Sequence, residues 1–178
     1  DLIGFLNEEE CMREAEPPLK AVAAAVSLMK GVVHQLNVAG GRAMLCNSAP
    51  QLAAFAPGGA YARHRDVPGE AGVTDAVTVL LYCNDGGEWP DAAGGHLRLH
   101  DPFGGAPTDV TPRGGTLVAF RSPLIEHEVL RCAAPRRALT LWAREGSHAD
   151  VHWHMAPGET AEQVEARERR SAARRASA

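Results

Sequence analysis

The sequence predicts a single, mainly β domain of the sandwich or jelly-roll class, supported by helices. Its 178 residues, 45% hydrophobic and 22% charged, suit one domain with a sizeable core. Only one long stretch before the centre of the chain has a helical apolar period. Beyond it, short apolar or β-branched runs alternate with Gly, Pro, Asn and Asp, which is typical of many short strands joined by turns.

The helical stretch opens at Pro17-Pro18 and is followed by apolar residues at i+3 and i+4 spacing. Such spacing places the apolar side chains on one face, so we expect an amphipathic helix packed on the core. Gly40-Gly41 ends it. The apolar positions are Leu19, Val22, Val26, Met29, Val33 and Leu36.

The following hundred or so residues contain seven predicted strands, separated by turn signals such as Pro57-Gly58-Gly59 and Gly114-Gly115. After Trp153 the composition changes to Ala, Glu and Arg, which predicts a surface helix over 157–178 that frays into a disordered end. The chain is therefore expected to be one domain over 1–178, with its core at about 19–144. The predicted strands are Gln51–Phe55, Tyr61–Arg65, Val73–Tyr82, His96–Leu99, Thr116–Arg121, Glu126–Leu130 and Arg137–Ala143.

Charge and composition exclude several classes of function. Eighteen Lys and Arg against twenty-two Asp and Glu give a net charge of −4, which does not favour binding to nucleic acid or to an anionic membrane. The longest apolar run, 21–29, is far shorter than the roughly 20 residues of a membrane span. The four cysteines form no CxxC pair, so we expect a reducing, cytoplasmic setting. We also expect the protein to occur in the nucleus and to be a monomer.

The segment Tyr61-Ala-Arg-His64-Arg-Asp66 carries the first candidate chemistry. Residues two apart on a strand point the same way, so His64 and Asp66 present an imidazole and a carboxylate on one face. Alone, this pair also fits two exposed polar residues. His127, on a later predicted strand, offers a third ligand, and two His with one carboxylate leave three positions open on Fe(II) for a bidentate 2-oxo acid and dioxygen.

Arg136 adds a fourth group to this constellation. It begins an alternation with Ala138, Thr140 and Trp142 along the last strand, and if that face lines a barrel interior it carries a buried cation that needs an anionic partner. No carboxylate in the other strands is an obvious partner. A small acidic ligand would satisfy the guanidinium, and a zinc site alone would not explain it.

Five ordered motifs from about Ser27 to Ala143 give the chain its resemblance to a known family. It resembles the 2-oxoglutarate- and Fe(II)-dependent prolyl 4-hydroxylases, and within them the oxygen-sensing, hypoxia-inducible-factor type. The motifs are Tyr61-Ala-Arg-His64-Arg-Asp66, Val77-Thr-Val-Leu-Leu-Tyr82-Cys-Asn84, Gly94-Gly-His-Leu97-Arg98, His127-Glu-Val129 and Arg136-Arg-Ala-Leu-Thr140-Leu-Trp142.

The resemblance implies a double-stranded β-helix, a cupin-like jelly roll, and a role for each matching residue. His64, Asp66 and His127 would hold Fe(II). Arg136 and the Tyr82 hydroxyl would bind the distal carboxylate of 2-oxoglutarate. Either Arg136 or Arg137 matches the cosubstrate arginine, and the shared face with Thr140 and Trp142 favours Arg136. Thr140 would lie beside the cosubstrate, within an apolar wall of Leu97, Val129 and Trp142.

The implied reaction is hydroxylation of a prolyl residue in a protein, using O2 and 2-oxoglutarate, with succinate and CO2 as co-products and ascorbate as reductant. Two departures from the family bear on it. Phe55 stands, with a one-residue gap, where a tyrosine usually contacts the cosubstrate, and the turn Ser122-Pro-Leu-Ile-Glu126, on a surface expected to meet the substrate, lacks the arginines of the animal oxygen sensors. Residues 6–16 fall where the family carries a mobile loop.

Three alternatives remain at this point. The enzyme could hydroxylate a free amino acid or small metabolite, the fold could be a binding module without activity, or the metal could be hydrolytic zinc, for which no general base is positioned by the sequence. The remaining histidines are interpreted as surface or structural residues: His96, His100, His148, His152 and His154.

Overall fold

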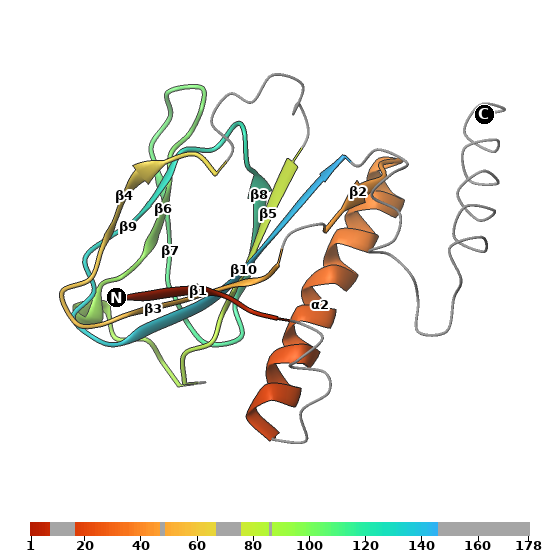
Figure 1. The fold of residues 1–178 in the computed structure, drawn as a ribbon. Helices are drawn as coiled ribbons and strands as arrows, with labels where there is room; N and C mark the ends of the chain where they lie inside the picture. The colour runs from red at the N-terminus through yellow and green to blue at the C-terminus, as the bar shows by residue number, and fades with distance from the viewer. Residues whose placement is uncertain (8–16, 47–48, 67–75, 86, 146–178) are drawn as a thin grey trace, which may run out of the picture.

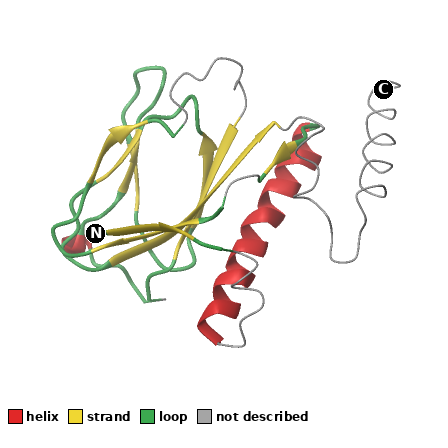
Figure 2. Cartoon of the chain, in the orientation of Figure 1, coloured by secondary structure: helices red, strands yellow, loops and turns green. Residues whose placement is uncertain are grey.

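The computed structural model describes residues 1–7, 17–46, 49–66, 76–85 and 87–145 (Figure 1). Two antiparallel sheets face each other, and the helix α2 (Pro17–Gly40) covers the outer face of the larger one (Figures 1 and 2). This arrangement confirms the predicted jelly roll. The other elements are β1 (Leu2–Phe5), β2 (Met44–Leu45), β3 (Gln51–Phe55), β4 (Tyr61–His64), β5 (Ala76–Tyr82), η1 (Asp91–Ala93), β6 (Leu97–Leu99), β7 (Thr108–Val110), β8 (Leu117–Arg121), β9 (His127–Val129) and β10 (Arg136–Glu145).

The larger sheet has the order β1-β3-β10-β5-β8, and β2 also pairs with β10. Alternation along β10 divides its residues between the two faces of the sheet. Leu139 and Leu141 pack with Met29 and Val33 of α2 in one core cluster. Residues of the opposite parity therefore face the smaller sheet, which are Arg136, Ala138, Thr140 and Trp142.

The smaller sheet has the order β4-β9-β6-β7. Its register pairs His64 directly with His127, and His127 with Leu99, across neighbouring strands. One further step along β9 and β6 pairs Leu97 with Val129. The register of this sheet therefore places two of the candidate ligands next to each other.

Helix α2 has the length and apolar composition of a possible membrane span over Leu19–Gly40. One side of it is nevertheless packed in the protein core, because Val26, Met29 and Val33 are buried there. These are three of the positions that the helical period selects. The amphipathic pattern thus found the buried face correctly, and the helix begins at Pro17 and ends at Gly40, as the Pro17-Pro18 and Gly40-Gly41 signals predict.

All seven predicted strands are present, with small changes of boundary. The last one begins at Arg136 rather than Arg137 and continues to Glu145, because β2 prolongs the pairing beyond β3. Three strands, β1, β2 and β7, were not predicted. The predicted helix at 157–178, most of the loop at 6–16 and the three histidines beyond the barrel lie outside the described residues.

Candidate functional site

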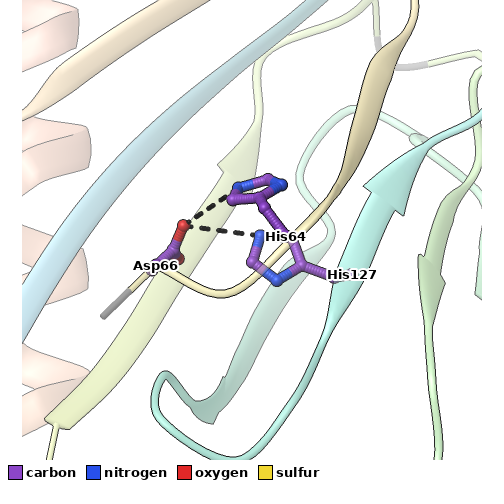
Figure 3. Close-up of side chains that lie close together, drawn as sticks. All are labelled: His64, Asp66 and His127. Carbon is purple, nitrogen blue, oxygen red and sulfur yellow. Dashed lines mark ion pairs between the residues drawn. The ribbon is translucent and has the colours of Figure 1, made fainter. Parts of the chain in front are cut away.

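Two neighbouring strands of the smaller sheet, and the segment after one of them, bring His64, Asp66 and His127 together (Figure 3). His64 ends β4, Asp66 lies two residues beyond that end, and His127 begins β9. The Nε2 atoms of His64 and His127 lie 3.3 Å and 3.5 Å from the same carboxylate oxygen, Oδ1 of Asp66. One ligand atom from each residue falls within 4.8 Å of the other two, which is close enough for a single ion.

Backbone carbonyls determine which nitrogen of each imidazole faces this centre. His64 Nδ1 lies 2.8 Å from the carbonyl oxygen of Ala62, and His127 Nδ1 lies 3.3 Å from that of Ile125. A carbonyl only accepts, so each Nδ1 donates and each neutral ring directs the Nε2 lone pair toward Asp66. Two lone pairs and a carboxylate oxygen repel one another unless a cation lies among them. The arrangement therefore favours a metal ion or a bound proton.

The pKa directions of Asp66 and His64 agree with this. Burial alone would raise the pKa of Asp66, but the His127 and His64 rings, where one carries the bound proton, and the hydrogen bond from Thr78 outweigh burial and hold that pKa well below its usual range. The bond to Asp66 in turn raises the pKa of His64. The carboxylate is thus ionised and available as a ligand at neutral pH.

Arg136 lies at the far end of the inner face of β10 and is only 1% exposed. Its Nε donates to the carbonyl oxygen of Gly95 at 2.8 Å, and one terminal nitrogen lies 3.5 Å from the Tyr82 hydroxyl. Burial lowers the pKa of the guanidinium, with Tyr82 opposing that effect. No carboxylate of the described residues pairs with it. A buried cation with this surrounding is suited to an anionic ligand.

Two aromatic rings flank the same guanidinium. The Arg136 Cζ atom lies 5.5 Å from the centre of the Phe55 ring and 5.0 Å from that of Tyr82. Phe55 is the residue directly opposite Arg136 in the β3–β10 register. Phe55 thus gives Arg136 a cation–π contact, which stabilises the arginine without offering a hydrogen bond to a ligand.

The remaining inner-face residues lie between these two ends. Thr140 is buried on β10 between Arg136 and Trp142. Leu97 packs with Tyr82 in a core cluster and pairs with Val129. Trp142 lies opposite Thr78 and contacts Phe5 at 6.5 Å between ring centres, and its buried indole N–H has no hydrogen-bond partner.

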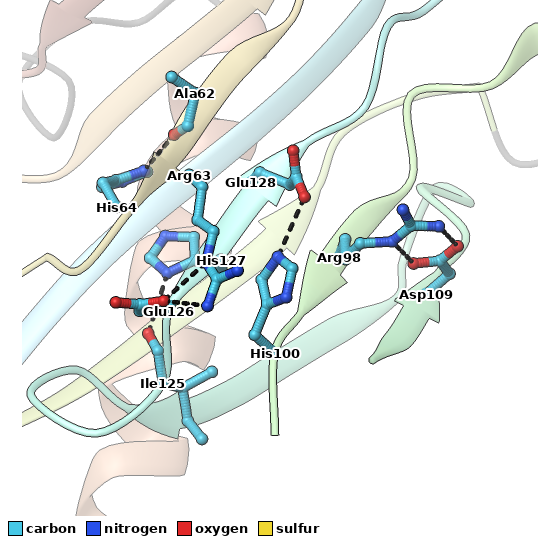
Figure 4. Close-up of polar contacts among 10 residues, drawn as sticks. All are labelled: Ala62, Arg63, His64, Arg98, His100, Asp109, Ile125, Glu126, His127 and Glu128. Carbon is cyan, nitrogen blue, oxygen red and sulfur yellow. Dashed lines mark hydrogen bonds and ion pairs between the residues drawn. The ribbon is translucent and has the colours of Figure 1, made fainter. Parts of the chain in front are cut away.

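On the outer face of the smaller sheet, ion pairs cross each strand boundary (Figure 4). Arg63 Nε donates to Glu126 at 2.6 Å, His100 lies 3.0 Å from Glu128, and Arg98 makes two bonds to Asp109. Arg65 also lies 3.3 Å from Glu126. Exposed pairs of this kind contribute little singly. Together they link β4, β9, β6 and β7, which hold His64 and His127.

The structure thus groups the candidates that the sequence selected. His64, Asp66 and His127 surround one point, and the predicted cosubstrate residues line the same interior. Arg137 lies on the opposite face of β10 from Arg136 and is exposed, and His96 and His100 lie outside the cluster. Sequence reasoning missed Thr78, which donates to Asp66, and Ser122, which bonds to Thr78, because nothing in their spacing distinguishes them from ordinary strand and turn residues. Ser122 is also wholly buried, so it is not part of a substrate-facing surface.

Residues 50–144 match the family model of the 2OG-Fe(II) oxygenase superfamily, and the chain belongs to this superfamily. The matched region includes every residue of the site described above. Two imidazoles and a carboxylate suit Fe(II), and the buried guanidinium suits a dicarboxylate, so the residues present fit both groups that the family name implies.

Among its relatives are several prolyl hydroxylases. Over 95 residues the chain is 36% identical to the hypoxia-inducible factor prolyl hydroxylase of Caenorhabditis elegans, an alignment that covers 51% of this chain and 12% of that protein. It is similar to a solved prolyl-4-hydroxylase of Pseudomonas putida, with a TM-score of 0.65, 28% identity and coverage of 82% of this chain and 72% of the other. It is also similar to a Trichoplax adhaerens prolyl hydroxylase that was solved with a hypoxia-inducible factor peptide. That comparison has a TM-score of 0.67 and 26% identity, and it covers 80% of this chain and 62% of the other.

Proposed function

We propose that this chain is an iron(II)- and 2-oxoglutarate-dependent dioxygenase that hydroxylates the 4-position of a prolyl residue in a protein substrate. The observation that carries this proposal is the meeting of three ligand atoms within 4.8 Å inside a barrel that also buries an arginine without a carboxylate partner. Succinate and CO2 are the co-products.

His64, Asp66 and His127 would hold the iron through Nε2, Oδ1 and Nε2. The backbone carbonyls of Ala62 and Ile125 fix the two rings in the tautomer that coordination needs. Because only three protein ligands converge, three positions of an octahedral ion remain for other ligands. Metal coordination replaces the repulsion between the lone pairs, so the site gains most from a divalent cation.

Arg136 and the Tyr82 hydroxyl would bind the distal carboxylate of 2-oxoglutarate. Each charge-assisted hydrogen bond of this kind contributes about 1.5–3 kcal/mol. Thr140 would lie beside the cosubstrate, while Leu97, Val129 and Trp142 exclude water and so strengthen these bonds. When bound, iron and 2-oxoglutarate supply the oxidising chemistry, in which O2 is consumed, CO2 is lost and a substrate C–H bond becomes C–OH.

A protein substrate is proposed because the relatives named above are prolyl hydroxylases and one was solved with a peptide fragment of the hypoxia-inducible factor. Oxygen sensing and ascorbate as reductant belong to the same proposal. The chain spans 12% of the length of its curated relative, and the turn that ends at Glu126 lacks the arginines of the animal oxygen sensors. The substrate is therefore expected to be a proline-containing protein that differs from the substrate of the animal oxygen sensors.

The test is to incubate the chain with Fe(II), 2-oxoglutarate and a proline-containing peptide library, and to follow succinate together with peptides that gain one oxygen atom. We expect both products in stoichiometric amounts with peptides. Oxidation of free proline in place of peptides would support the small-molecule alternative. Succinate that does not depend on iron, or no turnover with any substrate in host lysate, would contradict the proposal.

A further inference from the structure

The two oxygens of the Asp66 carboxylate have different partners. Oδ1 lies toward His64 and His127, at 3.3 Å and 3.5 Å from their Nε2 atoms. Oδ2 accepts a hydrogen bond of 2.6 Å from the Thr78 hydroxyl. One oxygen thus faces the proposed iron, and the other is bound to β5 of the larger sheet.

The Thr78 hydroxyl has a second partner, Ser122. Their oxygens are 2.8 Å apart, and both side chains are buried, at 1% and 0% exposed. A hydroxyl has a single hydrogen, and that of Thr78 is donated to Asp66, whose ionised carboxylate only accepts. Ser122 must therefore donate to Thr78. The result is a directed chain of two hydrogen bonds from Ser122 through Thr78 to Asp66.

These two hydrogen bonds link the larger sheet to the candidate metal site. The strand pairing of β4 with β9 positions His64 and His127, but Asp66 lies beyond the end of β4 and outside that pairing. Thr78 lies in the middle of the larger sheet, where β5 pairs with β8 and β10 on either side. The carboxylate is thus oriented by the opposite sheet from the one that orients the imidazoles.

We propose that Thr78 and Ser122 are positioning residues that make Asp66 a ligand through Oδ1 alone. The inference rests on the proposed function, since it assumes that the three residues bind a metal. A carboxylate free to rotate can bind one ion through both oxygens and would fill one of the three positions that a 2-oxo acid and O2 require. With Oδ2 held by Thr78, that position stays open.

The main test variant is Thr78→Val, which keeps the size and branching of the side chain but removes the hydroxyl. Thr78→Ser restores the hydroxyl, Ser122→Ala removes the outer donor, and Thr116→Val is a matched control at a half-buried threonine before β8. Two readouts are taken with Co(II) in place of iron: the dissociation constant, and the separation of the Asp carboxylate stretching bands in infrared difference spectra.

We expect Thr78→Val to weaken Co(II) binding by roughly 10- to 100-fold, as is usual when a hydrogen-bond partner of a metal ligand is lost. Its carboxylate bands should move closer together, the signature of binding through both oxygens. Thr78→Ser and Thr116→Val should match the wild type. Ser122→Ala should weaken Co(II) binding by about threefold, because it removes only the donor that supports the bond from Thr78 to Asp66.

Unchanged affinity and bands in Thr78→Val would overturn the positioning role while leaving the metal site intact. If the wild type itself binds no Co(II), both this inference and the proposed function fail. Unfolding of each metal-free variant in urea shows whether it is folded. If Thr78→Val does not fold, Ser122→Ala is compared with Thr78→Ser and the wild type instead. Equal spectra and affinities in these three proteins would then reject the positioning role of Thr78 and Ser122.

Discussion

Arg136 and Arg137 are neighbours in sequence, but their side chains lie on opposite faces of β10. Arg136 points into the interior with Tyr82 and Phe55, and Arg137 is exposed. A one-residue change of register would exchange them, so the pairing of β10 with β3 and β5 decides which guanidinium serves the interior.

This difference makes the two residues a matched pair for a test of cosubstrate binding. We expect Arg136→Gln to weaken 2-oxoglutarate binding to the metal-loaded chain by roughly 10- to 100-fold, the loss of one charge-assisted contact. Arg137→Gln should leave the affinity unchanged. Calorimetric titration measures both, and equal affinities in the two variants would exclude Arg136 as the cosubstrate arginine.

Phe55 offers a gain-of-affinity test. Its ring lies directly opposite Arg136, so Phe55→Tyr would place a hydroxyl near the guanidinium and the proposed cosubstrate carboxylate. One added hydrogen bond of about 1 kcal/mol should tighten 2-oxoglutarate binding by about fivefold. Phe55→Leu, which keeps an apolar side chain but removes the ring, should weaken it. Weaker binding of 2-oxoglutarate by Phe55→Tyr would show that the added hydroxyl forms no hydrogen bond with the cosubstrate.

Removal of a metal ligand should have a much larger effect. We expect Asp66→Ala and His127→Ala to bind no Fe(II) at micromolar concentrations and to show no iron-dependent turnover, because two protein ligands do not retain the ion. His96→Ala, outside the cluster, is the control. Iron content after gel filtration and succinate production report the outcome, and full activity in Asp66→Ala would remove that residue from the ligand set.

Metal binding should depend on pH through His64. Its pKa is raised above 6.5 by the bond to Asp66, so in the metal-free protein the protonated ring stabilises the fold fully below pH 6.5, and this contribution is lost as pH rises through the folded pKa. A metal displaces that proton. Co(II) affinity should therefore rise as the pH rises through the range in which His64 loses its proton. The rise should be at most about tenfold per pH unit for one proton. A flat profile from about pH 6 to about pH 8 would contradict the competition.

Helix α2 can be tested through its two faces. Met29 is 0% exposed in the core, whereas its neighbour Leu28 is 59% exposed. We expect Met29→Ala to lower the free energy of unfolding by about 2–5 kcal/mol and Leu28→Ala by less than about 0.5 kcal/mol, as measured in urea. Similar losses at both positions would mean that the exposed face of α2 is also packed.

Strong local signals explain what could be predicted from the sequence. The i+3 and i+4 period of Val26, Met29 and Val33 identified the buried face of α2, and strand alternation separated Arg136 from Arg137. The short strands were harder. β2 and β7 have two and three residues, too few to establish an alternation, and β1 is an exposed edge strand defined only by its pairing with β3.

The contacts of the site were less accessible than its ligands. His64 and Asp66 share a local motif, but the bond from Thr78 to Asp66 joins residues 12 apart and that from Ser122 to Thr78 residues 44 apart. Threonine and serine are common in strands and turns, so their types carry no signal. The ring of Phe55 likewise acquires its contact with Arg136 only through the register of β3 with β10.

The most direct test of the account is the binding of 2-oxoglutarate to the chain without oxygen, measured with and without Fe(II). The account predicts saturable binding that requires the metal, disappears in Asp66→Ala, weakens in Arg136→Gln and persists in Arg137→Gln. Binding that is the same without iron, or the same in all four proteins, would contradict it.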